Sequence, residues 1–341
     1  MRTPSPPDGT YETDPAHLSV YSRAACLYVR RPAGVVFPRG PEDLAWALGF
    51  CRHEKQSLTL RGGGSGLAGQ TVGRGTVADV SRWMNRILRI DPERREAAVE
   101  PGVVCSDLNR AAALHGLRFS PDPSSQDFCT VGGMLANNSK GGRAVRYGTT
   151  VDHVRRLRLL LPDGEEAELA RGWRRPEDYP HPALRRAAAL ILASRDRIAA
   201  RWPRSRTNAS GYNLMGCLGP EGRVDLVPLF VWSEGTLGVF LEAAVGLEPI
   251  PKGQSTALVQ FADVASAAQA VLDLIPLRPS ALEIMDNTFL DIARRGLSSI
   301  PLPLDDATRC VLILESDGGG AEEAEAGMDA LLAAARGAGP A

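Results

Sequence analysis

Hydrophobic and polar positions alternate with strand and helix periods along most of the chain. Val35, Val36 and Phe37 form a short apolar run, and the "SLTLR" segment at 57–61 alternates, so both predict strands. Between them, the segment from Pro41 to Cys51 repeats its apolar positions every three or four residues, which predicts a helix opened by a proline. The pattern is strand, helix, strand.

The middle of the chain continues this mixture. "TVADVS" and "EAAVEPG" predict strands that flank the connection "RWMNRILRIDPERR", and "CSDLNRAAALHGLRF" predicts a helix. "VRRLRLLLPDGEEAEL" predicts a hairpin with Pro-Asp-Gly at its turn. A long helix is predicted for "PALRRAAALILASRDRIAARWP", and two strands around a turn for "VPLFVWSEGTLGVFLEAAVGLEPIP".

The composition of the chain shifts at residues 249–253. After this point strand and helix patterns alternate, which predicts a second α+β domain. The segments are "TALVQFAD", "VASAAQAVLDLI", "ALEIMD", "NTFLDIARR", "CVLILES" and "AEEAEAGMDALLAAARG". Residues 1–18 are rich in proline and polar residues, and we expect a loose arm there.

Charge and cysteine usage exclude several classes of function. The 341-residue chain carries 39 Lys and Arg against 40 Asp and Glu, so no excess positive charge favours nucleic acid or an anionic membrane. No apolar run is long enough to cross a bilayer, and the N-terminus has no secretory pattern. We therefore expect a cytoplasmic protein, with peripheral association at the inner face of the membrane left open.

The six cysteines and five histidines are scattered, without CxxC, HxH or HExxH. These spacings are the usual signatures of zinc or iron–sulfur sites, so no metal site is expected from this chain alone. The thiols are expected to be free and partly buried.

A glycine-rich stretch, "LTLRGGGSGLAGQTVG" from Leu58 to Gly73, is the strongest candidate for chemistry. It lacks the Gly-Lys-Ser/Thr ending of a phosphate-binding P-loop. Gly64, Gly66 and Gly69 satisfy GxGxxG, but no helix pattern follows, as a Rossmann fingerprint requires. Two alternatives remain open: a backbone concavity that binds a phosphate or pyrophosphate, and a plain surface loop.

Two later segments favour the binding alternative. "TVGGMLANNSKGGRAVRYG" brings further glycine pairs together with short polar side chains, and "WSEGTLGVF" places Gly235 and Gly238 between apolar runs. Three such loops on one scaffold suit an extended ligand with a diphosphate at its centre.

The ordered motifs "RGGGSGLAGQ", "DPSSQDFCTVGGMLANNSKGGRAVRYGTTVDHV", "SGYNL" and "SEGTLGVFLEAAVGL" resemble FAD-linked oxidases of the vanillyl-alcohol-oxidase type (PCMH-type FAD-binding). The subgroup they resemble most contains D-lactate, glycolate and D-2-hydroxyglutarate dehydrogenases. The resemblance implies an α+β fold. It gives a loose arm at 1–18, an FAD-binding domain of two α+β subdomains at 19–250 and a partial α+β substrate (cap) domain at 251–341.

The resemblance also implies roles for residues. The backbone of Arg61, Gly62, Gly63, Gly64, Ser65, Gly66 and Leu67 would wrap the pyrophosphate. The other cofactor contacts it implies are Pro121, Thr130, Gly132, Gly133, Asn137, Ser139, Tyr147, Glu234, Gly235, Gly238 and Val239. Against these roles, the glycines can serve turn geometry alone and Tyr147 can be a core aromatic. The first loop lacks the histidine that often carries a covalent flavin, so non-covalent FAD is expected.

The chain departs from the family at its end, where relatives continue with an H-x-H pair, a later Glu-His element and a substrate-binding arginine. We therefore name no catalytic base. His153 is expected to be structural, while Arg206 and Tyr212 are candidates for binding a substrate carboxylate. Solvated arginine and packed tyrosine are the plainer alternatives for these two residues.

The function implied by the resemblance is oxidation of a small 2-hydroxy acid by hydride transfer to flavin N5. Electrons would pass to a partner or a quinone-type acceptor. An iron–sulfur subunit or the missing C-terminal part would be the partner. The alternatives are a non-catalytic FAD-binding assembly subunit, a truncated product with an incomplete active site, and a different flavin chemistry on the same fold.

Overall fold

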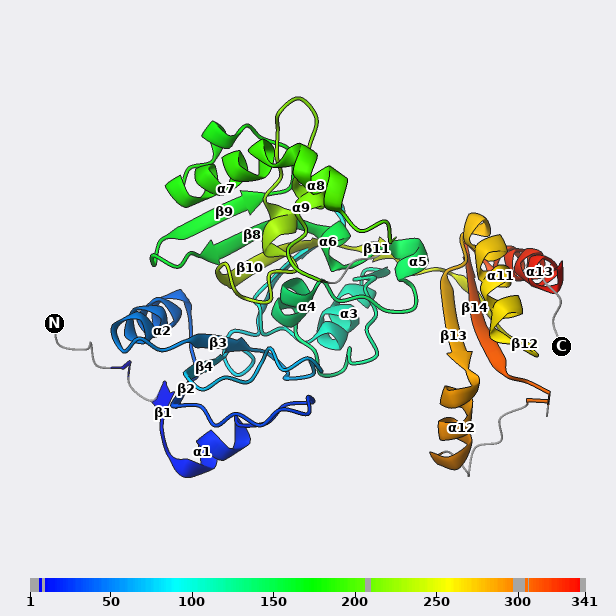
Figure 1. Ribbon diagram of the computed structural model, residues 1–341, viewed down its shortest axis with the longest axis horizontal. Helices are drawn as coiled ribbons and strands as arrows, with labels where there is room; N and C mark the ends of the chain where they lie inside the picture. Colours follow the sequence, from blue (N-terminus) through cyan, green and yellow to red (C-terminus); the bar gives the residue numbers. More distant parts are fainter. Residues whose placement is uncertain (1–5, 8–9, 206–209, 297–303, 306, 338–341) are drawn as a thin grey trace. The chain divides into compact units, whose positions relative to one another are not determined.

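The computed structural model of the chain describes residues 6–7, 10–205, 210–296, 304–305 and 307–337. It contains two compact units (Figure 1). Unit 1 comprises residues 1–119, 124–139 and 149–248, and unit 2 comprises 120–123, 140–148 and 249–341.

The first part of unit 1 is a four-stranded sheet in the order β1-β2-β4-β3. Its strands are β1 (Tyr11–Glu12), β2 (Gly34–Val36), β3 (Leu58–Arg61) and β4 (Thr76–Asp79). Helix α2 (Pro41–His53) connects β2 to β3, and both strands run parallel to β4. Parallel strands need such a crossover, and α2 buries Leu44, Ala47 and Cys51.

The second part of unit 1 is a five-stranded antiparallel sheet in the order β5-β6-β10-β8-β9. Its strands are β5 (Ile87–Asp91), β6 (Glu96–Val99), β8 (Val154–Leu160), β9 (Glu166–Ala170) and β10 (Val239–Gly246). One face buries Leu157 and Phe240 in the main core of the unit. Leu160 and Leu241 belong instead to the core around Val36, so the two sheets share a hydrophobic layer.

Shorter elements complete unit 1. They are α1 (Pro15–Val20), α3 (Cys105–Ala113), β7 (Leu117–Arg118), α4 (Val131–Asn137), α6 (Thr150–His153), η1 (Pro176–Asp178), α7 (Pro182–Ala193), α8 (Arg195–Arg201), α9 (Leu214–Cys217) and α10 (Val227–Phe230). In Figure 1, α1 lies beside β1 and β2, while α7 and α8 lie beside β9. β11 (Glu248–Pro249) lies at the boundary of the units. None of the helices in the described ranges has the length and apolar character needed to cross a bilayer.

Unit 2 is built on a three-stranded antiparallel sheet in the order β12-β14-β13 (Figure 1). Its elements are β12 (Gly253–Phe261), α11 (Val264–Leu274), η2 (Ile275–Leu277), β13 (Ala281–Asp286), α12 (Asn287–Gly296), β14 (Cys310–Gly318), α13 (Ala321–Gly337) and the short α5 (Ala144–Tyr147). Phe261, Leu274, Leu312 and Leu331 form its core between the sheet and α11 and α13.

Charged contacts hold the segment 140–148 within unit 2. The Arg143 guanidinium donates to the carboxylates of Asp122 (3.2 Å) and Glu315 (2.9 Å). The Tyr147 hydroxyl donates to Asp317 at 2.6 Å. Because the Arg143 side chain is only 26% exposed, its two ion pairs are partly shielded from water.

The α+β class and most predicted elements are confirmed, and two segments form helices that were not predicted. Residues 131–137 form helix α4 inside a stretch predicted to be a loop, and residues 227–230 form α10 where a strand was predicted. In α4, Val131, Met134 and Leu135 are buried and Thr130 caps the helix by accepting from the Gly133 amide. Burial of apolar side chains overrides the low helix propensity of the glycine pair.

Three smaller expectations also need correction. The connection between the predicted strands at 76–79 and 96–99 contains an additional strand, β5. The predicted long helix at 182–203 is divided into α7 and α8 at Ser194. The N-terminal arm is ordered from Tyr11, because that residue pairs with Val36 and Asp14 caps α1.

We predict that Phe261→Ala destabilises unit 2 by about 3–5 kcal/mol, since the substitution leaves a cavity at a fully buried position. Hydrogen exchange of β12 and β14 peptides should accelerate accordingly. Phe289→Ala is the matched control, because this ring is 53% exposed. Equal exchange in the two variants would contradict the assigned core.

Candidate functional site

The first glycine-rich loop leaves the end of β3 at Arg61. The Arg61 side chain donates to the carbonyl oxygen of Arg23 (2.7 Å) and its guanidinium lies 5.0 Å from the centre of the Tyr21 ring. The Tyr21 hydroxyl donates to Asp79 at the end of β4. Arg61 therefore fixes the start of the loop through its side chain, while Gly64 turns the backbone with a φ of 66°.

The first loop packs directly on the residues that precede α4. A Cβ on Gly62 would overlap the Thr130 hydroxyl, and one on Gly63 would overlap the Phe128 carbonyl oxygen. These two glycines are therefore required by the close approach of two loops. Neither is among the glycines with positive φ, so close packing rather than turn geometry accounts for this pair.

Gln70 adds a side-chain link between the same loops. Its amide nitrogen donates to Asn137 Oδ1 at 3.2 Å. Asn137 is the last residue of α4, so the first loop contacts the helix at both ends.

The third loop, residues 231–238, binds the C-terminal half of α4 through its backbone. The Trp232 amide donates to the Leu135 carbonyl and the Glu234 amide to the Ala136 carbonyl, both at 2.9 Å. Trp232 and Glu234 have positive φ values of 91° and 51°, which are uncommon for side-chain-bearing residues. All three glycine-rich loops therefore meet at α4.

The three loops enclose adjoining cavities within unit 1. One cavity of about 560 Å³ is lined by the residues Ala25, Gly62–Leu67, Thr71, Ser124, Ser125, Phe128–Thr130, Gly133, Asn137 and Ser139. A second of about 490 Å³ is lined by Leu48, Ser57–Leu60, Gln70, Leu160, Pro162, Glu234–Thr236, Gly238 and Val239. A third, of about 60 Å³, adjoins both, because it shares Gly62, Thr71, Gly133 and Asn137 with one and Leu60, Gln70, Glu234, Gly235 and Gly238 with the other. Each larger cavity lies within the usual range for ligand sites, about 300–1,000 Å³.

Most residues predicted to contact the cofactor line these cavities. They are Arg61, Gly62, Gly63, Gly64, Ser65, Gly66, Leu67, Thr130, Gly132, Gly133, Asn137, Ser139, Glu234, Gly235, Gly238 and Val239. Gly133 is informative, because the nearest atom to an added Cβ is Thr130 Oγ1 at 3.6 Å. Its bare face points toward open space rather than toward packed protein.

Pro121 and Tyr147 are not among these lining residues. Both lie in segments that belong to unit 2, and Tyr147 donates to Asp317 there. Tyr212 hydrogen-bonds Thr236, a lining residue, at 2.8 Å. Arg206 lies outside the described residues.

Several lining residues were missed in the sequence analysis, including Gln70, Thr71, Pro101, Ser125, Cys129 and Phe240. Gln70 and Thr71 follow the first glycine run directly, and this proximity was the available signal. Pro101 and Phe240 reach the cavity only through the fold.

Two buried polar atoms at the cavities have no protein partner. Gln70 Oε1 and Thr71 Oγ1 are both excluded from water without a hydrogen bond in the described structure. A buried hydroxyl or amide oxygen without a partner is costly, so these atoms suit contact with a polar ligand. The cavities thus offer both bare backbone and unsatisfied polar groups to a bound molecule.

His153 does not join the cavities. It ends α6, is 5% exposed and packs edge-on against Phe119 at 5.8 Å, consistent with a structural role.

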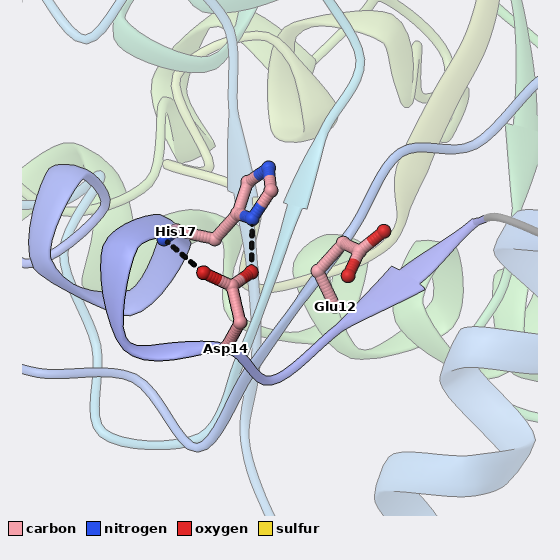
Figure 2. Close-up of side chains that lie close together, drawn as sticks. All are labelled: Glu12, Asp14 and His17. Atoms are coloured by element: carbon pink, nitrogen blue, oxygen red, sulfur yellow. Dashed lines mark hydrogen bonds and ion pairs between the residues drawn. The ribbon is translucent and has the colours of Figure 1, made fainter.

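One group of potential metal-ligating side chains occurs among the described residues: Glu12, Asp14 and His17. Figure 2 shows the Asp14 carboxylate hydrogen-bonded to the His17 ring and to the His17 backbone amide, with Glu12 beside them. The His17 hydrogen bond lowers the pKa of Asp14, and the carboxylate also caps α1. Helix capping accounts for this arrangement without an ion.

Family comparisons agree with the geometry of the site. Residues 32–170 match the family described as FAD binding domain, and residues 250–341 match the family described as FAD linked oxidases, C-terminal domain. The first match contains the first two glycine-rich loops. The third loop lies between the two matches.

Curated relatives share about 30% identity with the chain. A D-2-hydroxyglutarate dehydrogenase of Pseudomonas putida is 31% identical over 85% of this chain and 30% of its own length. Glycolate oxidase subunit GlcD of Bacillus subtilis is 31% identical over 92% of this chain and 57% of its own length. The chain therefore spans little more than half of these relatives at most.

A solved structure of alkyldihydroxyacetonephosphate synthase has the same fold. Its TM-score is 0.69 at 18% identity, over 98% of this chain and 58% of that protein. Taken with the three loops that meet at α4, these matches show that the chain belongs to the FAD-linked oxidases of the vanillyl-alcohol-oxidase (PCMH) type, whose cofactor is FAD.

Proposed function

We propose that unit 1 binds FAD non-covalently in the adjoining cavities around α4. The observation that carries the proposal is the meeting of three distant glycine-rich loops around a set of adjoining cavities. An extended dinucleotide can occupy several adjoining cavities, and no histidine is among the described residues that line them, so none offers a covalent attachment there.

The residues nearest each cavity suggest how the cofactor would be held. The loop from Arg61 to Leu67 supplies backbone amides and the Ser65 hydroxyl for the pyrophosphate, while Arg61 itself is engaged by the protein. Thr71, Gly133 and Asn137 would contact the part of FAD in the joining cavity. We retain Pro121 and Tyr147 as candidates from the family resemblance alone.

We propose further that the whole protein oxidises a small 2-hydroxy acid of the D-lactate, glycolate or D-2-hydroxyglutarate class. Support comes from relatives that bear those names at about 30% identity. Bound FAD would supply a hydride acceptor at N5. Within the described residues, Tyr212 remains the candidate for contact with the substrate carboxylate, while no residue is assigned as the base.

The electrons would leave to a partner protein or a quinone-type acceptor, in a complex at or near the inner face of the membrane. The support for a complex is the relative named as a subunit of glycolate oxidase. The same observation favours a second candidate function, an FAD-binding assembly subunit without turnover of its own.

We expect Gly133→Leu to weaken FAD binding at least about tenfold, because the new side chain would project into the cavity. FAD titration followed by flavin fluorescence measures the loss. Gly49→Leu is the matched control, since Gly49 is an exposed helical glycine with no atom within 4 Å of an added Cβ. Unchanged affinity in Gly133→Leu would overturn the assigned site.

Thr71→Val should separate cofactor binding from folding. Removal of a buried hydroxyl without a partner should leave the apoprotein as stable or up to about 1–3 kcal/mol more stable, while FAD affinity falls. Urea unfolding of the apoprotein and FAD titration measure the two effects. Thr256→Val, on an exposed strand position, should change neither the FAD affinity nor the cavity. A loss of apoprotein stability with intact FAD affinity would contradict a ligand role for Thr71.

Turnover of the FAD-loaded chain separates the two candidate functions. D-lactate, glycolate and D-2-hydroxyglutarate are offered with an artificial electron acceptor, and reduction of the acceptor is recorded. Turnover of at least one acid is expected for the dehydrogenase. If FAD stays bound but none of the acids is turned over, even when a partner or C-terminal part is supplied, the result would support the assembly subunit instead.

A further inference from the structure

Two buried cysteines lie opposite each other where the segment before α4 runs beside the start of α3. Val104 and Thr130 form an antiparallel bridge, and the Cys105 amide donates to the Cys129 carbonyl at 3.0 Å. The second bond of this bridge runs from the Val131 amide to the Val103 carbonyl at 2.8 Å. The two cysteines adjoin this isolated bridge, and a hydrogen bond between their side chains brings the sulfur atoms of Cys105 and Cys129 together.

The contact between the two side chains is what a disulfide needs. A disulfide requires Cα atoms about 4.4–6.8 Å apart with the side chains directed at each other. Here one backbone hydrogen bond and one side-chain hydrogen bond join the same two residues. Both cysteines are free thiols in this structure.

The surroundings of the two sulfur atoms favour reaction at Cys129. A hydrogen bond from Cys105 lowers the pKa of the Cys129 thiol, with a further contribution from the Ser125 hydroxyl, against the opposing effect of burial. Asn109 Nδ2 lies 3.9 Å from Cys105 Sγ and can donate to it. By contrast, burial raises the pKa of Cys217 to about 12, and it also raises the pKa of Cys51 and Cys310.

Access to the pair comes through the cofactor cavity. Cys129 is 6% exposed and lines the cavity of about 560 Å³, whereas Cys105 lies behind it with no exposed surface. A small reagent can therefore reach Cys129 from the cavity, and Cys105 is placed to react second.

We propose that Cys105 and Cys129 form a redox-active thiol pair in the wall of this cavity, which hydrogen peroxide converts to a disulfide. The Cys129 thiolate attacks one peroxide oxygen, the O–O bond breaks, and the departing hydroxide takes up a proton to form water. Cys105 sulfur then attacks the resulting Cys129 sulfenic acid, the S–O bond breaks, and a second water leaves. Two electrons pass from the thiols to peroxide.

The pair adjoins a contact on which the loops depend. Phe128 and Thr130 flank Cys129 and are the residues that Gly62 and Gly63 approach too closely for side chains. A bond at Cys129 therefore acts on the same turn that positions the first and second loops. The thiol chemistry itself does not rest on the proposed function.

The test treats the full chain with hydrogen peroxide and maps its cysteines by mass spectrometry. A linked Cys105–Cys129 peptide is expected, with a loss of about 2 Da that a thiol reductant reverses. Sulfenic or sulfonic acid at Cys129 without the link would overturn the proposal, as would a link between Cys26 and Cys129. Complete survival of both thiols would do the same.

Single variants sharpen this result. Cys26→Ser removes a partly exposed thiol near the cavity and should leave the link intact. Cys105→Ser should abolish the link and leave Cys129 as a sulfenic acid that dimedone traps. The map of the unsubstituted chain decides the question if a variant fails to fold.

FAD addition tests the route of access separately. Saturating FAD should slow disulfide formation at least about tenfold if FAD fills the cavity through which peroxide reaches Cys129. A link that forms equally fast with FAD bound would overturn access through the cavity. A chain that forms the link but binds no FAD would disprove the proposed function and leave the thiol pair standing.

Discussion

The site depends on the docking of three loops onto one short helix. Helix α4 receives the first loop at Thr130 and Asn137 and the third loop at the carbonyls of Leu135 and Ala136. Loops carry backbone groups that must be satisfied when they leave water, and here the helix supplies partners for them. Burial of Val131, Met134 and Leu135 keeps that helix in place. The adjoining cavities follow from this arrangement.

The glycines at the site divide into two physical classes. Gly62 and Gly63 are bare because another loop passes where their side chains would lie. Gly133 and Gly235 meet almost nothing nearby, although Gly235 also has a φ of 76°. The first class builds the cavity, and the second keeps it open. The three glycine-rich loops together therefore combine folding and binding requirements.

Chain continuity ties the cofactor loop to unit 2. Ser139 lines a cavity of unit 1, and the following residues, 140–148, belong to unit 2. Arg143 and Tyr147 hold that segment through Glu315 and Asp317 on β14. A motif that is continuous in sequence thus serves two different units, and Tyr147, predicted to contact the cofactor, belongs to unit 2 and bonds Asp317 there.

By itself, the sequence determined the α+β class, most strands and the glycine-rich loops, because hydrophobic period and glycine content are local properties. It also carried the resemblance to FAD-linked oxidases, and most of the cofactor contacts that this resemblance implied line the cavities. Only the tertiary structure decided that residues 131–137 form a helix, since burial outweighs the propensity of Gly132 and Gly133. The pairing of Cys105 with Cys129, the unsatisfied oxygens of Gln70 and Thr71, and the allocation of 140–148 to unit 2 were likewise beyond the sequence. Each of these depends on which distant segments meet, and no local pattern encodes that.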